Sequence, residues 1–259
     1  MLSITDAQLN AWIAAFIYPL ARILGLVATA PLFNNAAIPM RIKLVLGLGI
    51  ALALAPVLPP APPIAPASWF GLGLLLEQSL VGIALGFTMR VAFAAVDLAG
   101  ELIGLQMGLG FAVFYDPLNA AQLPIIAELA GLLALLVFVA LNGHLAVLGV
   151  LAQSFTLLPL DAAAFPATGW EAVARWGAML FAAGVLLSLP LIAALLITNI
   201  ALGILTRAAP QLNLFAVGFP VTLVAGFVVL ALTLPYLPVG LERLFGQGLD
   251  AMGALLGAR

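Results

Sequence analysis

Long apolar stretches are the feature of this sequence that most limits what it can fold into. A helix needs roughly 20 apolar residues to cross the hydrocarbon core of a bilayer. Stretches of about this kind occur at 11–33, 42–58, 71–96, 125–151, 173–206 and 212–237. None shows the alternation of apolar and polar residues that a strand of a membrane β-barrel requires. The sequence therefore predicts an all-α protein with about six long apolar helices and no β-structure.

Proline- and glycine-containing breaks separate these stretches. The clearest break is 59–66, which contains five prolines and cannot continue a helix. The second stretch is short for a perpendicular span and the fifth is long. We therefore expect helical hairpins that are integral to a membrane or associated with one, rather than a row of uniform spans.

Composition restricts the surfaces that the folded chain can present. Hydrophobic residues make up 65 % of the chain and charged residues 7 %, whereas soluble domains have roughly 25 % charged residues. Such a chain must cover apolar surface with lipid or with partner subunits. The formal net charge of −2 argues against nucleic acid as a partner, because nucleic-acid binding needs a dense Lys/Arg surface.

Several charged residues interrupt the apolar stretches or directly follow them. A charge that faces lipid is costly, so such residues normally face protein or water. We interpret them as partners in charge pairs between helices or between subunits, and a proton or ion relay is the alternative. These residues are Arg22, Glu77, Arg90, Asp97, Glu101, Glu128, Arg175 and Arg207.

Basic residues near the breaks suggest an orientation in the membrane. Arg41, Lys43, Arg90 and Arg207 lie in or beside alternate breaks, which the positive-inside rule assigns to the cytoplasm. Three further arginines lie on the opposite side. This balance of four against three favours both termini outside the cytoplasm.

Glycines recur at four-residue spacing in the first half of the chain. On a helix, such glycines form a flat stripe that lets another helix approach closely. The last stripe runs into the segment 111–117, which contains three aromatic residues and an Asp-Pro break. Irregular backbone at membrane depth must be shielded from lipid, so we interpret this segment as a loop packed inside protein. The glycines are Gly82 and Gly86, then Gly100, Gly104 and Gly108.

The sequence offers no convincing catalytic or metal-binding constellation. His144 is the single histidine, so an intramembrane serine protease would have one candidate base, and a metal site would lack further ligands at suitable spacing. An aspartyl dyad would have to combine Asp116 with Asp97, whose context is unconvincing. We therefore expect no enzyme activity, no cofactor and no metal, and a structural hydrogen-bonding role for His144. A secondary transporter remains an alternative, although no inverted repeat is evident.

Several motifs along the chain resemble those of one protein family and occur in the same order as in that family. The resemblance covers about 11–237, and its motifs are specific because they occur together in register. They lie at 30–33 with 38–43, 82–87 with 100–109, 142–144, 209–213 and 218–220. The family is that of the flagellar biosynthetic protein FliR. The injectisome counterpart is similar in architecture and is the alternative within this resemblance, although Gly104-Leu105-Gln106-Met107-Gly108 and Ala209-Pro210-Gln211-Leu212-Asn213 look closer to the flagellar branch.

The resemblance implies a role in protein export. Members of this family are non-enzymatic subunits of the flagellar type III export gate, in the flagellar basal body of the bacterial inner membrane. They assemble with FliP, FliQ and FlhB around a pore for unfolded flagellar proteins. The chain would be a single subunit, 1–259, with N-terminal helices and a plug loop in 1–124 and helical hairpins in 125–259.

The resemblance also implies which residues close the pore. Matched onto this sequence, the plug loop of the family corresponds to 106–123, with aromatic side chains filling the lumen. The residues expected to plug or gate the pore are Gln106, Met107, Gly108, Gly110, Phe111, Phe114, Tyr115, Asp116 and Pro117.

Overall fold

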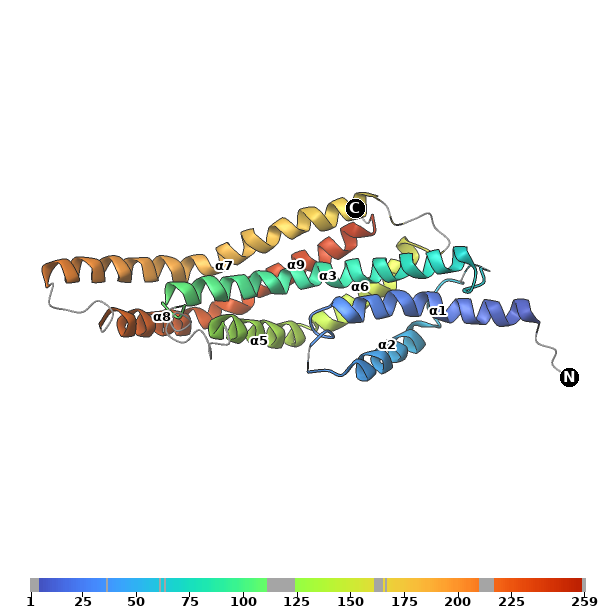
Figure 1. The fold of residues 1–259 in the computed structure, drawn as a ribbon, viewed down its shortest axis with the longest axis horizontal. Coiled ribbons are helices and arrows are strands. Elements are labelled where there is room, and N and C mark those ends of the chain that lie inside the picture. Colours follow the sequence, from blue (N-terminus) through green and yellow to red (C-terminus); the bar gives the residue numbers. More distant parts are fainter. Residues whose placement is uncertain are drawn as a thin grey trace. The chain divides into compact units, whose positions relative to one another are not determined.

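The computed structural model describes residues 5–35, 37–60, 62, 64–110, 124–160, 165, 167–209 and 217–257, and most of these residues are helical. No strand occurs among these residues, so the all-α prediction is confirmed. The helices, shown in Figure 1, are α1 (Asp6–Thr29), α2 (Met40–Leu54), α3 (Trp69–Gln106), α5 (Ile125–Ala140), α6 (Gly143–Leu157), α7 (Ala167–Ala208), α8 (Phe219–Thr233), the short 3-10 helix η2 (Leu234–Tyr236) and α9 (Leu237–Leu255).

Within the described residues, four helical stretches are long and apolar enough to cross a membrane. They are Gln8–Thr29, Trp69–Gln106, Ala167–Ala208 and Phe219–Leu255, and a bent pair of α5 and α6 makes a fifth if it is counted as one span. The expected number of about six is therefore approximate. Helix α2 has only 15 residues, and the last apolar stretch continues through α8, η2 and α9 beyond the end expected from the sequence.

Local sequence explains where several helices begin and end. Thr5 caps α1, because its side chain accepts a hydrogen bond from the Gln8 backbone N–H while the Gln8 side chain accepts one from the Thr5 N–H. Between α5 and α6, Asn142 adopts a left-handed conformation with φ 57°, which asparagine tolerates better than most residues. The helix is therefore interrupted between Ala140 and Gly143.

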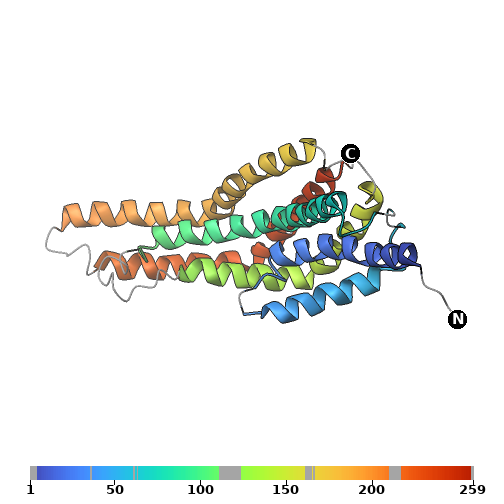
Figure 2. The ribbon, with the colours of Figure 1, turned by 45° about the vertical axis from the view of Figure 1, so that its right-hand side comes forward.

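The described contacts divide the chain into two compact units, whose boundaries fall within α3, α7 and α9 and between α5 and α6. Unit 1 contains Met1–Val91, Asn142–Gly177 and Phe245–Arg259. In this unit α1 and α2 form a hairpin, which is visible in both views (Figures 1 and 2). Tyr18 and Arg22 of α1 and Phe155 of α6 are among its fully buried side chains. Trp176 donates a hydrogen bond to the Thr88 carbonyl oxygen at 2.8 Å, which ties α7 to α3.

Unit 2 contains Ala92–Leu141 and Ala178–Leu244. Its core is built from the second part of α3 together with α5, α7 and α8. Phe93 of α3 and Phe138 of α5 pack edge to face, with ring centroids 5.4 Å apart. Large apolar side chains also remain exposed in this unit, such as Ile197 at 70 % and Leu232 at 67 %. The apolar residues of this unit therefore exceed what its own core can bury.

Candidate functional site

Helix α3 ends at the start of the segment that the sequence singled out as a loop. Gly108 has φ +83°, a conformation that glycine adopts without steric cost. The N–H of Gly108 donates to the Leu105 carbonyl and the N–H of Leu109 donates to the Gly104 carbonyl, each at 3.0 Å. This pair of bonds is a Schellman motif, which satisfies the last carbonyls of a helix. Gly108 thus shares the four-residue spacing of Gly100 and Gly104 but terminates the helix.

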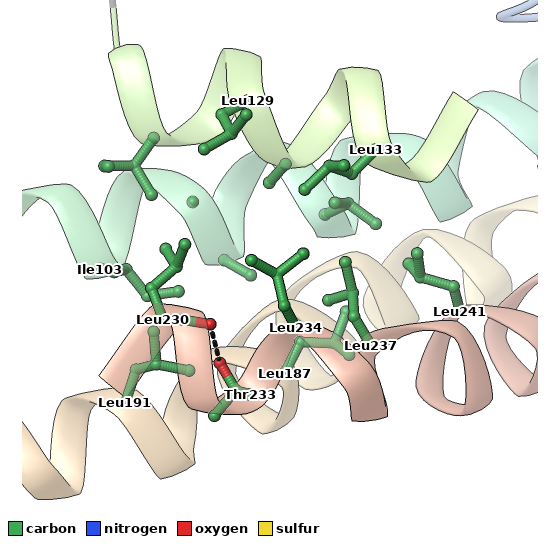
Figure 3. A pocket seen from close by; sticks show the side chains of 15 residues that line it. Ile103, Leu129, Leu133, Leu187, Leu191, Leu230, Thr233, Leu234, Leu237 and Leu241 are labelled. Carbon is green, nitrogen blue, oxygen red and sulfur yellow. Dashed lines mark hydrogen bonds between the residues drawn. The ribbon is translucent and has the colours of Figure 1, made fainter. Parts of the chain in front are cut away.

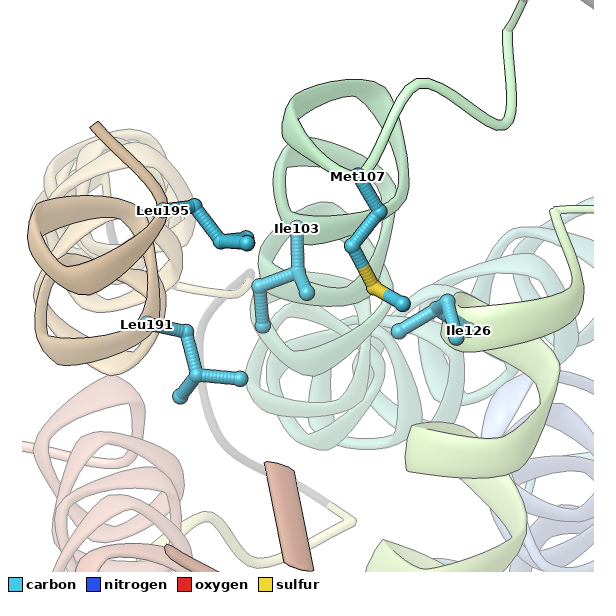
Figure 4. Close-up of a cluster of buried hydrophobic side chains, with 5 residues drawn as sticks. All are labelled: Ile103, Met107, Ile126, Leu191 and Leu195. Carbon is cyan, nitrogen blue, oxygen red and sulfur yellow. The ribbon is translucent and has the colours of Figure 1, made fainter. Parts of the chain in front are cut away.

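Met107 fixes this helix end in the core of unit 2. Its side chain is fully buried and forms a cluster with Ile103, Ile126, Leu191 and Leu195, which come from α3, α5 and α7 (Figure 4). On α8, Gly226 leaves room for Met107, since a methyl group at Gly226 would lie 2.6 Å from the Met107 Cγ atom. Four helices thus hold the residue from which the predicted loop departs.

The predicted loop returns to the same cluster. The residues Phe111, Phe114, Tyr115, Asp116 and Pro117 lie outside the described part of the chain, whereas Gln106 is the last residue of α3 and Gly110 is exposed. After the loop, α5 begins behind Pro124, and Ile126 enters the Met107 cluster. Ala127 packs against Gly100 of α3 so closely that a methyl group on Gly100 would overlap the Ala127 backbone. Both ends of the segment 111–123 are therefore attached to one buried core.

The glycines at four-residue spacing lie at two different helix contacts. Gly82 and Gly86 of α3 face α1 in unit 1, where a methyl group on Gly82 would overlap the Arg22 carbonyl oxygen. Gly25 of α1 completes this contact, since its added methyl group would lie 2.5 Å from the Ser79 carbonyl oxygen. Gly100 and Gly104 face α5 in unit 2, and Gly104 is the looser, with Ile126 at 3.8 Å. The sequence pattern did not single out Gly25, because no second glycine stands four residues away from it.

Arg22 is a fully buried charge at the α1–α3 contact. Its Nε donates to Gln78 Oε1 at 2.8 Å, its Nη1 to Ser154 O at 2.7 Å and to Ser154 Oγ at 3.0 Å, and its Nη2 to Leu158 O at 2.9 Å. The guanidinium also lies 4.3 Å from the ring centroid of Phe155. Arg22 thus links α1 to α3 and caps the carboxyl end of α6 through neutral partners. Sequence reasoning missed Gln78 and Ser154, although each is an isolated polar residue in an apolar stretch.

The remaining charged candidates lie mainly on the surface. Glu77 is half-buried, and Arg90, Asp97, Glu101, Glu128 and Arg207 are exposed. In the part of the chain that the structure describes, Glu77, Arg90, Glu101, Glu128 and Arg207 form no ion pair with one another or with another described residue. Arg175 forms an exposed pair with Glu171 at 2.6 Å on the same helix, and such pairs contribute little to stability.

An apolar pocket of about 70 Å³ lies in unit 2 between α3, α5, α7 and the α8–η2–α9 stretch (Figure 3). Leucines and isoleucines line most of it, and no charged residue does. The Thr233 hydroxyl is the one polar side-chain group in the lining, and it already donates to the Leu230 carbonyl at 2.9 Å. This pocket therefore lacks the ionisable groups that a transporter uses to bind an ion.

His144 lies in the first turn of α6, next to the left-handed Asn142. Its Nδ1 atom is buried and finds no hydrogen-bond partner among the described residues. The hydrogen bond expected from the sequence is thus not formed at this nitrogen within the described chain.

Comparison with known proteins identifies the family. A family model for bacterial export proteins, family 1, matches residues 13–248. The flagellar biosynthetic protein FliR of Pectobacterium carotovorum subsp. carotovorum is 44 % identical over 257 residues, which cover 99 % of this chain and 98 % of that protein. FliR of Escherichia coli K12 is 43 % identical over 247 residues, or 95 % and 94 % of the two chains. FliR of Bacillus subtilis 168 is 31 % identical over 246 residues, or 93 % and 94 %.

The matched range includes the α1–α3 glycine contact, the Met107 cluster and the interruption between α5 and α6. The similarity thus extends over the whole helical architecture and is not confined to one short motif. The chain belongs to the FliR family of flagellar biosynthetic proteins, within family 1 of the bacterial export proteins.

Proposed function

We propose that this chain is a non-enzymatic subunit of the flagellar type III protein-export gate in the bacterial inner membrane. It acts as one unit over 1–259, helps to form the pore through which unfolded flagellar proteins pass, and plugs that pore with 106–123. Its partners are FliP, FliQ and FlhB. Membership of the FliR family and the apolar helices support the coarse assignment to a membrane-embedded component of flagellar protein export.

The observation that carries the plug proposal is the anchoring of Met107. A gate needs fixed ends and a movable middle, because the closed state must be reproducible while the barrier is displaced. Met107 and Ile126 supply buried ends on the two sides of the segment. Between them the sequence provides glycine, which allows backbone movement, and aromatic side chains, which cover a large area. Opening is then a shift between two conformations and involves no bond-making step.

The proposed partners account for the apolar surface that the chain leaves uncovered. In the most apolar window of Phe219–Leu255, only 6 % of the residues are buried within the chain. The corresponding value for Trp69–Gln106 is 67 %. A protein surface this apolar is stable only against lipid or other subunits. Neighbouring subunits can also supply charge partners for Arg90, Glu101 and Glu128, which lack an ion pair within the described chain.

The plug proposal is tested by removing two aromatic side chains. We expect Phe111→Ala with Phe114→Ala, or deletion of 110–116, to raise ion leak through the assembled complex, because the smaller side chains no longer fill the pore. Leak is measured with a potential-sensitive dye in cells that produce the complete complex, and assembly is measured by co-purification of the other subunits. The variant Leu105→Ala is the control, since the Leu105 side chain is 66 % exposed and the residue precedes the buried Met107.

Met107→Ala in the same assay tests the anchor separately. Replacing a buried methionine by alanine typically costs about 2–5 kcal/mol of stability, so the end of the loop should be held less firmly. Ion leak should be higher than in the Leu105→Ala control and lower than in the double variant. Background leak in the aromatic double variant, with the complex intact, would show that 106–123 is not the plug.

A further inference from the structure

A groove of about 410 Å³ lies in unit 1 between α1, α2 and α3. Its size is within the range of small-molecule sites, which hold roughly 300–1,000 Å³. Apolar side chains such as Leu20, Leu24, Leu44 and Ile83 form its walls. The Ser79 hydroxyl also lines it but is occupied by a hydrogen bond to the Leu75 carbonyl at 2.8 Å. The walls therefore suit a hydrocarbon chain.

Lys43 is the one charged residue in the groove lining. It is half-buried, and its Nζ donates to Asn34 Oδ1 at 3.0 Å. An ammonium group carries three donors, so this bond leaves two for another acceptor. No carboxylate lines the groove, and Lys43 forms no ion pair within the described chain. The groove thus combines an apolar cavity with an unneutralised cation, which is complementary to an anion that carries an apolar tail.

Lys43 lies in the first turn of α2, close to the carboxyl end of α1, and this position matches the depth of lipid headgroups. Helices α1 and α3 run in the same direction, since Arg22 contacts Gln78 and Thr29 contacts Ile83 farther along both helices. Trp12 and Trp69 therefore belong to one end of this pair, where both are exposed, as tryptophans at a membrane interface are. Lys43 bonds to Asn34 beyond the other end. The helix from Trp12 to Thr29 is about 26 Å long, close to the hydrocarbon thickness of about 30 Å.

We infer that the groove binds one anionic phospholipid, with an acyl chain between α1, α2 and α3 and the phosphate on Lys43. Basic pockets between membrane helices bind such headgroups. The lipid would hold α2 against α1 and α3, because α2 is short and buries only Gly47 and Ala51 within the chain. This lipid site is independent of the plug and adds a bound ligand to the proposed gate.

The site is tested by counting bound lipids on the full chain, purified together with its co-purifying subunits. The sample is equilibrated in micelles with equal amounts of phosphatidylglycerol and phosphatidylethanolamine that carry the same acyl chains, and retained lipid is measured by native mass spectrometry. We expect preferential retention of phosphatidylglycerol. Lys43→Gln should lower it about tenfold, as expected for the loss of one charge-assisted hydrogen bond, and Lys43→Arg should restore most of it.

Two further variants distinguish lipid binding in the groove from general attraction of anionic lipid to surface charge. Arg41→Gln is the matched control, because Arg41 is exposed in the same turn of α2 and does not line the groove. It should change retention by less than about twofold, as expected for a screened surface charge. Ala28→Leu fills the groove at an exposed position of α1 and should abolish retention. Equal effects of the Lys43 and Arg41 variants would overturn the site. The site would also be overturned if Ala28→Leu left the amount of bound lipid unchanged but caused the loss of a co-purifying subunit. That result would show that a helix of the partner subunit fills the groove.

Discussion

At the scale of single residues, the burial of Arg22 depends on the shape of its side chain. A buried charge is tolerated only when its donors are satisfied. Arg22 achieves this through three separate nitrogens that reach Gln78, Ser154 and Leu158. The planar guanidinium can donate hydrogen bonds to all of these acceptors at the same time, whereas the compact ammonium of lysine cannot reach all of them. Two of the acceptors are carbonyl oxygens at the carboxyl end of α6, one of Ser154 in the last turn and one of Leu158 at the C-cap. The Ser154 oxygen also accepts a hydrogen bond from the Leu158 N–H at 3.0 Å.

We expect both Arg22→Met and Arg22→Lys to destabilise unit 1. Methionine leaves several buried acceptors without donors, which should cost about 2–5 kcal/mol in total. Lysine keeps the charge but satisfies fewer acceptors, so it should rescue little. The measurement is the midpoint of thermal unfolding of the full chain purified together with its co-purifying subunits, followed by the fraction that remains monodisperse on gel filtration.

Arg175→Met provides the matched control for Arg22. Arg175 is also an arginine on an apolar helix, but its side chain is 79 % exposed and pairs with Glu171 on the surface. Its loss should shift the midpoint by no more than the equivalent of about 1 kcal/mol. Equal midpoints for the Arg22 and Arg175 variants would contradict the anchoring role of Arg22.

At the scale of helices, the contact between α1 and α3 is set by backbone proximity. Gly25, Gly82 and Gly86 have no side chains, so carbonyl oxygens of one helix approach the backbone of the other. Close backbone contact of this kind supports dispersion attraction and weak Cα–H···O bonds. The Arg22 side chain is placed by the same contact, because its own carbonyl faces Gly82.

We expect Gly82→Ala to force α1 and α3 apart. The added methyl group would overlap the Arg22 carbonyl, and overpacking of this kind costs about 1–3 kcal/mol. Gly73→Ala on the same helix is the control, since nothing lies within 4 Å of the added methyl group and alanine should stabilise the helix by up to about 1 kcal/mol. Opposite shifts of the thermal midpoint are expected, and a stabilised Gly82 variant would refute the close contact.

At the scale of the whole molecule, the apolar helices bury too little of themselves to be stable alone. Exposed apolar side chains cover α2, α7 and α8, and Val224 at 60 % and Ile204 at 66 % are examples. The same chain carries exposed charges without an ion pair in its described part, such as Glu101 and Arg90. Both features have one explanation if neighbouring subunits cover the apolar faces and supply the opposite charges.

We expect charge reversal at Glu101 or Arg90 to impair assembly more than it alters any exported substrate. A reversed charge would face a like charge across a subunit boundary, where like charges repel strongly. The yield of the complex on co-purification measures assembly. Glu171→Lys is the control, because Glu171 already has its partner Arg175 within the chain. Normal yield after both reversals would argue against pairing between subunits.

Much of the architecture could be predicted from residues close together in the sequence. Apolar stretches and proline-rich breaks gave the helical class, and the spacing of Gly100 and Gly104 gave a close helix contact that the structure places against α5. The end of α3 was harder to predict, because Gly108 has the same spacing as its neighbours in the stripe but takes a left-handed conformation. A glycine that packs against a helix and a glycine that ends one look alike in sequence.

The helical class, the apolar character and the membership of the FliR family can be inferred from sequence, because hydropathy and local motifs are properties of neighbouring residues. Three contacts follow from the tertiary fold alone: Gly25 faces Ser79, Met107 packs against Gly226, and the hydrogen-bond acceptors of Arg22 are neutral groups. The partners in each case stand far apart in the chain. Spacing defines one face of one helix, but packing selects the helix that it meets.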